Sequence, residues 1–391
     1  FPRTFPVGIA FGVILVLPDQ LGSEERPVEV ATFREDATYT DHRRPSSVRF
    51  SNAEEDARRR DFTMNGLFLD PESGRVLDYV GGEADISRRV VRAIGQPEDR
   101  FGEDALRVLR ALRFAAGLDF EIDPATWNAL VSSATTLSAI SSERIRDELL
   151  KGLTQANPDR FLRLMHDSGC LSVILPEVAD MAGCTQPPQF HPEGDVLRHT
   201  ELLLANLPAS PSPALALAAL LHDVGKPPTR EVSDRIRFNQ HHRVGAEMAD
   251  SICRRLALSN QLREQVVEMV LHHMDFMHID RMRQATLRRM LARPTIAMEI
   301  DLHRADCLAS HGDTSNYDAA KRHLEELQAE ATGPSLPPPI INGEDLMALG
   351  LTPGPAFRRI LTAVQDAQLD GTVHTREEAI ALVRRMMPAG S

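Results

Sequence analysis

The stretch that decides the fold is residues 58–115, RRRDFTMNGLFLDPESGRVLDYVGGEADISRRVVRAIGQPEDRFGEDALRVLRALRFA. Its first half contains short β-rich runs, and PESGRVLDYVGG is typical of a hairpin around a Ser-Gly turn. Its second half spaces Leu106, Leu109, Leu112 and Ala116 on one face of a helix. The stretch therefore predicts a sheet followed by helices, and we expect an α+β chain.

The same division extends to both sides of this stretch. Upstream, VGIAFGVILVL (residues 7–17) predicts a buried hairpin around Gly12, and VEVATFR predicts a further strand. The runs ERIRDELLKGL and PDRFLRLMHDSG downstream are helical, and residues 191–311 hold ten of the fourteen histidines in a helical pattern. A Pro-rich linker, ATGPSLPPP (residues 331–339), precedes a tail of short helices around the turn GLTPGPA.

Composition indicates a soluble globular protein of two to four domains. The chain has 391 residues, 42% of them hydrophobic, and a formal net charge of -12, so any contact with nucleic acid depends on local basic patches. The four cysteines form no C-x-x-C pair, which argues against a zinc ribbon and fits a reducing cytoplasm. No run approaches the roughly 20 apolar residues that a membrane span needs.

Two motifs suit the binding of a nucleoside triphosphate. In EDALRVLR, Asp104 and Arg107 lie three residues apart, so they share a helical face; a carboxylate accepts from the amine of C or A, and a guanidinium donates to the same base edge. Glu103 could orient Arg107. In RRRDFTMN, the arginines suit a triphosphate, while Asp61 and Asn65 suit ribose hydroxyls. The alternatives are a solvated ion pair for the first motif and a basic surface turn for the second.

Histidines and carboxylates in the second half form an ordered set of potential metal ligands. LLHDVGKP places a His-Asp pair at the end of a helix, and other members of the set fall on or beside helical runs. Neutral imidazoles and carboxylates suit a hydrolytic divalent ion. The alternative is a scatter of unrelated surface and core histidines. The set comprises His199, His222, Asp223, His241, His272, His273 and Asp306.

Residues 1–170 resemble the class II tRNA nucleotidyltransferase and poly(A) polymerase family. The matching pieces include FPVGIAFGVILV, RRRDFTMNGLF, DYVGGEADI, EDALRVLRALRFA and SSERIRDEL. The resemblance implies a polymerase-β-like sheet followed by helical neck, body and tail regions. It also implies addition of CCA, part of CCA, or A tails to RNA 3′ ends, with CTP and ATP as substrates and Mg²⁺ as cofactor.

By position, the resemblance assigns Asp104 and Arg107 to base reading and Glu103 to the positioning of Arg107. It assigns triphosphate, ribose and further nucleotide contacts to Arg60, Asp61, Asn65 and Arg110. Glu29 would be the third metal carboxylate, and residues 39–47 the flexible loop near the growing 3′ end.

The family also carries a Gly-Gly-x-Val-Arg-Asp run and an Asp-x-Asp pair upstream of its FPVG strand, and neither is in these 391 residues. Two Mg²⁺ ions depend on those carboxylates. We expect that the sequence begins after them and does not polymerise by itself; CTP incorporation into a tRNA lacking CCA would refute this.

The histidine-rich half resembles the HD phosphohydrolase superfamily, with H…HD…H…HH…D in order. By position, His199, His222, Asp223 and Asp306 would bind a first divalent transition metal. His241 and His272 or His273 would complete a second site. Hydrolysis of 2′,3′-cyclic phosphates at damaged RNA ends is the activity that this resemblance implies.

Together these observations predict a nucleotidyltransferase head (1–84), a helical neck and body (85–190), an HD domain (191–330) and a helical tail (340–391). The primary hypothesis is a cytoplasmic CCA-adding tRNA nucleotidyltransferase with an appended HD phosphohydrolase. The alternatives are a poly(A) polymerase or partial CCA adder, a stand-alone HD phosphohydrolase, and a non-catalytic RNA-binding protein. The partners would be tRNA or another RNA 3′ end, with no membrane. These motifs predict neither the oligomeric state nor the choice between C and A.

Overall fold

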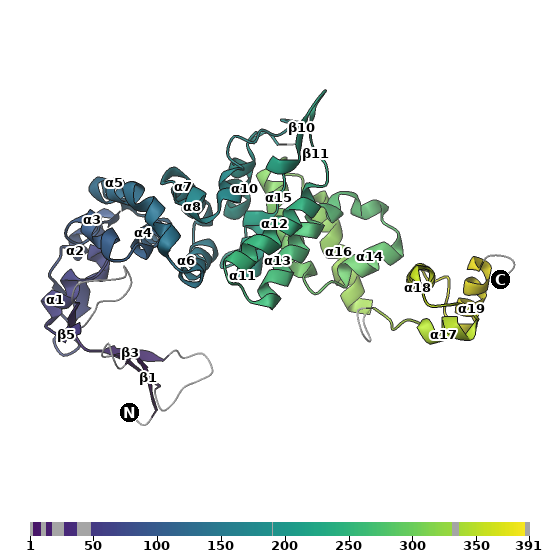
Figure 1. The fold of residues 1–391 in the computed structure, drawn as a ribbon, viewed down its shortest axis with the longest axis horizontal. Helices are drawn as coiled ribbons and strands as arrows, with labels where there is room; N and C mark the ends of the chain where they lie inside the picture. Colours follow the sequence, from purple (N-terminus) through teal and green to yellow (C-terminus); the bar gives the residue numbers. More distant parts are fainter. Residues whose placement is uncertain are drawn as a thin grey trace. The chain divides into compact units, whose positions relative to one another are not determined.

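The computed structural model describes residues 3–8, 13–17, 27–36, 48–189, 191–330 and 336–387. The chain divides into two compact units, residues 1–180 with 254–258 and residues 181–253 with 259–391. The first unit contains small sheets and helices, and the second is almost entirely helical (Figure 1). The expected α+β class is confirmed. No helix in the described part of the chain is long and apolar enough to cross a membrane.

The first unit opens with small antiparallel sheets. β1 (Thr4–Gly8), β2 (Val13–Val16) and β3 (Val28–Ala31) form one sheet in that order, which confirms the hairpin expected in residues 7–17, although the turn at Gly12 lies outside the described residues. The remaining strands form pairs: β4 (Arg34–Asp36) with β5 (Val48–Phe50), β6 (Leu67–Leu69) with β7 (Val76–Asp78), and the parallel β8 (Val90–Val91) with β9 (Glu121–Ile122). The β6–β7 pair is the hairpin expected around the Ser-Gly turn, with Gly74 at a positive φ of 67°.

The prediction of strands up to about residue 80 was wrong at two places. Residues 53–58 form helix α1 (Ala53–Arg58), because Asn52 caps its N-terminus by accepting from the amide of Glu55 and acidic residues fill its first turn. Residues 63–65 form the 3₁₀ turn η2 (Thr63–Asn65) instead of extending β6.

Helices complete the first unit. They are α2 (Gly82–Arg88), α3 (Pro97–Glu103), α4 (Leu106–Leu118), α5 (Pro124–Ser133), η3 (Ala134–Ala139), α6 (Ser142–Thr154), α7 (Pro158–Asp167), α8 (Cys170–Ile174) and α9 (Pro176–Ala179). The apolar face expected on α4 is buried, with Leu109 and Leu112 at most 1% exposed. α4 packs against α6 and α7, and its Arg113 donates to Glu148 of α6 at 2.6 Å.

The second unit is built around α11 (Pro213–Leu221), whose sequence PALALAALL is apolar on all sides. Every residue from Ala214 to Leu221 is buried, as expected for a helix at the centre of a core. It packs against α10 (Val196–Ala205), α13 (Asn260–His272) and α15 (Ile296–Ala309). The other helices are α12 (His241–Arg255), η5 (His273–Arg281), α14 (Gln284–Leu291) and α16 (Ser315–Glu330).

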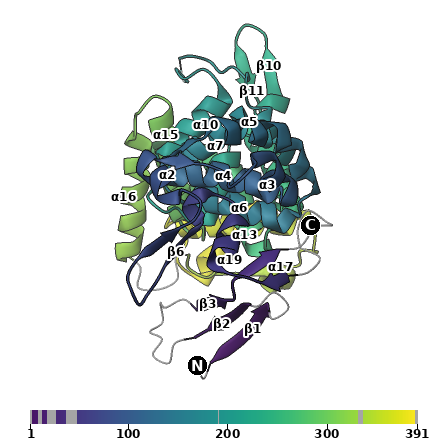
Figure 2. The same cartoon turned by 90° about the vertical axis from the view of Figure 1, so that its left-hand side faces the viewer.

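One feature of this unit differs from the expected all-helical pattern. The turn η4 (Pro227–Thr229) leads into an antiparallel hairpin, β10 (Arg230–Val232) with β11 (Ile236–Phe238). The hairpin projects from the helices of this unit in both views (Figures 1 and 2). After the linker, α17 (Gly343–Ala348), α18 (Pro355–Leu369) and α19 (Arg376–Met386) form the expected tail of short helices around their own apolar core.

Candidate functional sites

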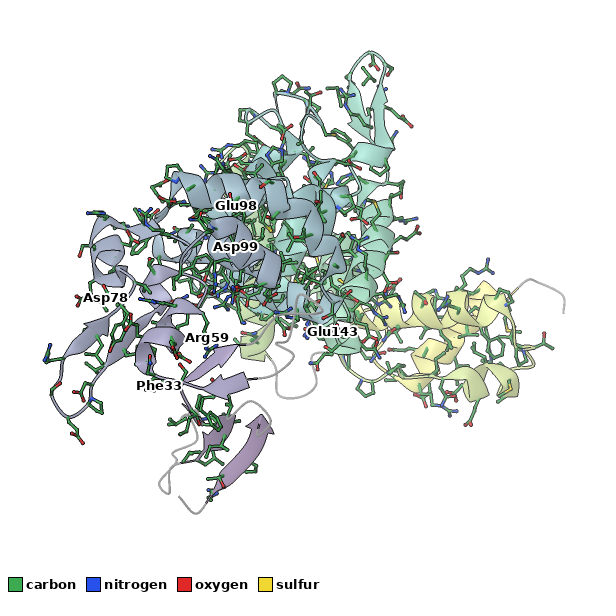
Figure 3. All side chains as sticks on the ribbon, turned by 60° about the vertical axis from the view of Figure 1, so that its left-hand side comes forward. Phe33, Arg59, Asp78, Glu98, Asp99 and Glu143 are labelled. Atoms are coloured by element: carbon green, nitrogen blue, oxygen red, sulfur yellow. The ribbon has the colours of Figure 1, made fainter. Side chains whose placement is uncertain are left out.

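An arginine-rich cavity of about 510 Å³ lies in the first unit, between the segment that follows α1 and the start of α4. It brings together six of the seven predicted nucleotide-binding residues. The seventh, Glu103, accepts a hydrogen bond from one of the six, Arg107. Figure 3 shows Arg59 in the segment after α1. The lining comprises Arg59, Arg60, Asp61, Asn65, Asp104, Leu106, Arg107, Arg110, Phe114 and Arg144. Five guanidinium groups against two carboxylates make this cavity suited to an anion.

Asp61 organises one wall of the cavity. Its Oδ1 accepts from the side-chain amide of Asn65 at 2.9 Å and from the backbone amide of Phe62 at 2.9 Å. Its Oδ2 accepts from Nε of Arg110 at 2.7 Å. Asp61 is only 8% exposed, so these bonds fix the positions of Asn65 and Arg110 relative to each other.

Arg107 is held from three sides. It donates to Glu103 Oε2 at 2.6 Å, to the carbonyl of Arg100 at 3.1 Å and to the carbonyl of Arg59 at 3.1 Å. The contact expected between Glu103 and Arg107 is therefore present. Because both carbonyls belong to the protein backbone, the guanidinium plane is fixed before any ligand arrives.

Asp104 does not lie on a helix, as the spacing argument assumed. It follows α3 with extended backbone angles (φ −148°, ψ 103°), and α4 begins only at Leu106. Its Oδ1 accepts from the amide of Leu106 at 3.1 Å, which explains the break: the side chain takes one of the unpaired amides at the start of α4. Asp104 and Arg107 still line the same cavity, although the reason is a turn between helices and not a shared helical face.

Glu29 is not part of this cavity. It occupies β3 opposite Leu15, its side chain is exposed, and it does not line the cavity. The loop predicted at residues 39–47 falls outside the described residues.

The second unit contains three histidines whose protonated nitrogen is set by the backbone. Nδ1–H of His222 donates to the carbonyl of Ala219 at 2.9 Å, that of His241 to Phe238 at 2.9 Å, and that of His273 to Val270 at 2.7 Å. A neutral imidazole carries one proton, so each Nε2 is left with a free lone pair. Metal-binding histidines commonly show the same arrangement, in which a carbonyl accepts from one ring nitrogen and the other is left for the ion.

The free nitrogens converge on Asp223. Its Oδ2 lies 3.1 Å from Nε2 of His222, and its Oδ1 lies 3.5 Å from Nε2 of His241 and 3.8 Å from Nε2 of His273. The Nε2 atoms of His241 and His273 face each other at 3.2 Å. Burial and the neighbouring His241 lower the pKa of His273 to about 3, which favours the neutral ring, and a neutral ring can offer Nε2 to a cation.

His199 and Asp306 complete the other side of this cluster. Nε2 of His199 lies 2.9 Å from Asp306 Oδ1 and 4.0 Å from Asp223 Oδ2, and Nδ1 lies 2.7 Å from Glu193 Oε1. Burial favours the neutral ring, but Asp306 and Glu193 outweigh it and raise the pKa of His199 to about 9. Three groups of potential ligands result in the described part of the chain, His191–Glu193–His199, His199–His222–Asp306 and Asp223–His241–His273.

The structure separates His272 from this cluster and includes His273. Nδ1 of His272 lies 2.8 Å from Asp275 Oδ2, and the ring is absent from all three groups of ligands. The reason is helical geometry, since adjacent residues at the end of α13 point about 100° apart. Sequence reasoning missed Glu193 and Lys226, whose Nζ lies 2.6 Å from Asp223; the adjacent motifs HPEGD and HDVGK were the available signal.

A cavity of about 460 Å³ opens beside this cluster. Its walls include Asp223, His241, His273 and Asp306, with Lys226 and, from the β10–β11 hairpin, Arg235 and Arg237. Cationic side chains beside a pair of ligand groups suit a phosphate ester.

Segments of the chain match three known domain families. Residues 1–92 match the poly A polymerase head domain, residues 119–181 match a region described as "Probable RNA and SrmB- binding site of polymerase A", and residues 196–310 match the HD domain.

Individual proteins that resemble most of the chain come from the same families. An A-adding tRNA nucleotidyltransferase of Deinococcus radiodurans is 37% identical over 355 residues, covering 85% of this chain and 79% of the relative. A CCA-adding enzyme of Streptococcus suis is 32% identical, with coverages of 97% and 82%. The crystal structure of the Bacillus stearothermophilus CCA-adding enzyme in complex with CTP matches at a TM-score of 0.71 and 25% identity, covering 99% of this chain and 84% of that one.

Proposed function

The chain belongs to the family of CCA-adding and A-adding tRNA nucleotidyltransferases with an HD domain, and we propose that its arginine-rich cavity selects CTP and ATP for addition to tRNA 3′ ends. The observation that carries the proposal is the fixed pair of Asp104 and Arg107 in a cavity with five guanidinium groups. The four-part division into head, neck and body, HD domain and tail, and a cytoplasmic location, belong to the same proposal.

The chemistry of the cavity follows from its donors and acceptors. The guanidinium groups of Arg60 and Arg110 grip phosphate oxygens, because planar donor pairs match two oxygens at once. Arg107 donates to the ring nitrogen of C or A and to the carbonyl of C, and Asp104 accepts from the exocyclic amine of either base. C and A present an amine at that position, whereas U and G present a carbonyl oxygen. The cavity therefore rejects U and G by placing two acceptors face to face.

Magnesium for the transfer step does not fit the described residues. Glu29 joins no group of three potential metal ligands in the described part of the chain, and one exposed carboxylate does not hold a pair of ions. We therefore assign nucleotide selection to these residues and derive no transfer step from them.

A second activity is proposed for the HD domain, hydrolysis of 2′,3′-cyclic phosphates at RNA ends with divalent transition metals. It is supported by two neighbouring groups of potential ligands, His199–His222–Asp306 and Asp223–His241–His273. Three imidazoles with free Nε2 atoms suit a transition metal better than Mg²⁺. Bound ions would supply a Lewis acid for the phosphate ester. Lys226 and Arg237 line the adjacent cavity and would hold the anionic ester against that centre.

The transferase proposal is tested with labelled CTP, ATP, UTP and GTP, measured as dissociation constants. We expect CTP and ATP to bind more tightly than UTP and GTP, by about tenfold or more for one bidentate base contact. Equal binding of all four would contradict the proposal.

The HD proposal is tested with 2′,3′-cyclic AMP in the presence of Ni²⁺, Mn²⁺ or Co²⁺. His222→Ala should abolish hydrolysis, whereas His166→Ala, at an exposed histidine of α7, should leave it unchanged. Full activity in His222→Ala would remove the assignment of this site.

A further inference from the structure

We propose that Arg144 is a specificity-determining residue of the transferase, because it fixes the carboxylate of Asp104 in the orientation that selects the base. Its Nη2 donates to Asp104 Oδ2 at 2.6 Å. Both side chains line the nucleotide cavity and are partly shielded from water, with 23% and 19% of their surface exposed. The inference deepens the proposed base reading by Asp104 and rests on it.

The acceptor positions of Asp104 determine how it can meet a base. An ionised carboxylate offers about four lone-pair positions, two on each oxygen. The amide of Leu106 takes one on Oδ1, and Arg144 takes one on Oδ2. One position on each oxygen remains for a ligand. With both oxygens held, the carboxylate plane is fixed, and the group meets a base only as an acceptor.

Without Arg144, one hydrogen bond from Leu106 is left to orient the group. The carboxylate could then turn about its Cβ–Cγ bond and move its free lone pairs away from a carbonyl oxygen of U or G. The amine of C or A would lose part of its attraction for the same reason. Discrimination falls more than overall affinity, because the triphosphate contacts are made by other arginines.

Arg144 approaches from a different part of the fold than the residues it serves. Asp104 and Arg107 belong to the junction of α3 and α4, whereas Arg144 lies in the first turn of α6, next to Glu143 (Figure 3). α6 packs along α4, so the packing of these helices sets the distance between the two partners. The base-reading carboxylate is thus positioned by a helix that begins about 40 residues later in the sequence.

The same helix offers a matched control. Arg146 is 25% exposed, close to the value for Arg144, but it donates to Asp147 at 2.9 Å and to the carbonyl of Ala257 at 2.7 Å, and it does not line the cavity. Arg144→Met and Arg146→Met remove the same charge and donors from the same helix. A difference between them reports on the contact with Asp104 and not on loss of an arginine from α6.

The experiment measures dissociation constants of CTP, ATP, UTP and GTP for the wild-type chain and both variants by isothermal titration calorimetry, without tRNA. For Arg144→Met we expect the ratio of the UTP to the CTP dissociation constant to fall about tenfold, as for loss of one good base contact. Arg146→Met should keep the wild-type ratio. An unchanged ratio in Arg144→Met, or an equal fall in Arg146→Met, overturns the proposal.

Two further outcomes are informative. If Arg144→Met does not fold, Arg144→Lys replaces it. One ammonium group cannot match the guanidinium geometry, so the ratio of the UTP to the CTP dissociation constant should be lower in Arg144→Lys than in the wild type. An equal ratio overturns the proposal. A wild-type chain that binds all four nucleotides equally would instead refute the proposed base reading itself. A chain that discriminates normally in every Arg144 variant refutes only the role of Arg144.

Discussion

Replacing Asp223 by Asn should destabilise the metal-free HD domain and remove its response to metal. Asp223 is 2% exposed, and His222 and Lys226 outweigh the effect of burial, which would otherwise raise its pKa; the pKa therefore lies well below the usual range. Asn has the same shape without the charge. It takes the anionic partner away from Lys226, itself only 5% exposed, and the acceptor that Gln186 offers at 2.5 Å is neutral.

The magnitude follows from this buried cation. Breaking a buried ion pair on one side costs about 3 kcal/mol or more, because the other charge stays uncompensated. For a domain of roughly 150–250 residues, about 1 kcal/mol lowers the melting temperature by about 2–4 °C, so we expect a fall of about 6–12 °C. The double variant with Lys226→Met should recover part of this loss, since the uncompensated charge is gone.

Scanning calorimetry at pH 7 measures both effects. In chelator, Asp223→Asn should melt lower than the wild type, and the exposed control Asp234→Asn should not. An ion at 100 times its dissociation constant stabilises the wild type by about 2.7 kcal/mol, and we expect no such rise in Asp223→Asn. Equal melting in chelator would refute the account of the buried pair; a retained rise with Ni²⁺ or Mn²⁺ would refute Asp223 as a shared ligand.

Three other changes test the remaining parts of the structure. Glu148 is buried between cationic neighbours on α4 and α6, whose hydrogen bonds outweigh burial and lower its pKa below 4.5, so its stabilising effect is present above pH 4.5 and lost as the pH falls through the lowered value. The loss of stability in acid should therefore be smaller in Glu148→Gln than in the wild type. An identical dependence of stability on pH in the two proteins would contradict this. Gly225→Ala would place a Cβ 2.1 Å from the carbonyl oxygen of His241, so His241 must move and metal affinity should fall by more than about tenfold in titration calorimetry; unchanged affinity would contradict this. Glu103→Gln removes the charged partner of Arg107, and CTP binding should weaken about tenfold; unchanged affinity would show that the two backbone carbonyls suffice.

The residues of the nucleotide cavity could be predicted from the sequence because they lie in short motifs. Arg60, Asp61 and Asn65 follow one another closely, and so do Asp104 and Arg107. The geometry was predicted less well: the spacing suggested one helix, but Asp104 sits in a break between two helices, where its side chain accepts from the amide of Leu106. A local bond of this kind competes with helix formation at single residues, and periodicity averages over a whole turn.

Long-range partners were beyond the same reasoning. Arg144 meets Asp104 across 40 positions, and Lys226 meets Gln186 across 40 as well, because helix packing brings them together. The choice between His272 and His273 depended on where α13 ends. Helix ends are the least certain part of any prediction from periodicity, and one residue at that point turns a side chain by about 100°.

Two of the histidines whose Nδ1 bonds a backbone carbonyl also lie at helix C-termini. His222 follows α11 and His273 follows α13, and each donates Nδ1–H to a backbone carbonyl of the preceding turn. The same ring closes a helix with one nitrogen and offers the other to a cation. A chain that gave up phosphate hydrolysis would still need both rings for its helix ends. Asp306 is a ligand without such a role at a helix end. In a relative that has lost the activity, we therefore expect substitutions at Asp306 before substitutions at the two histidines.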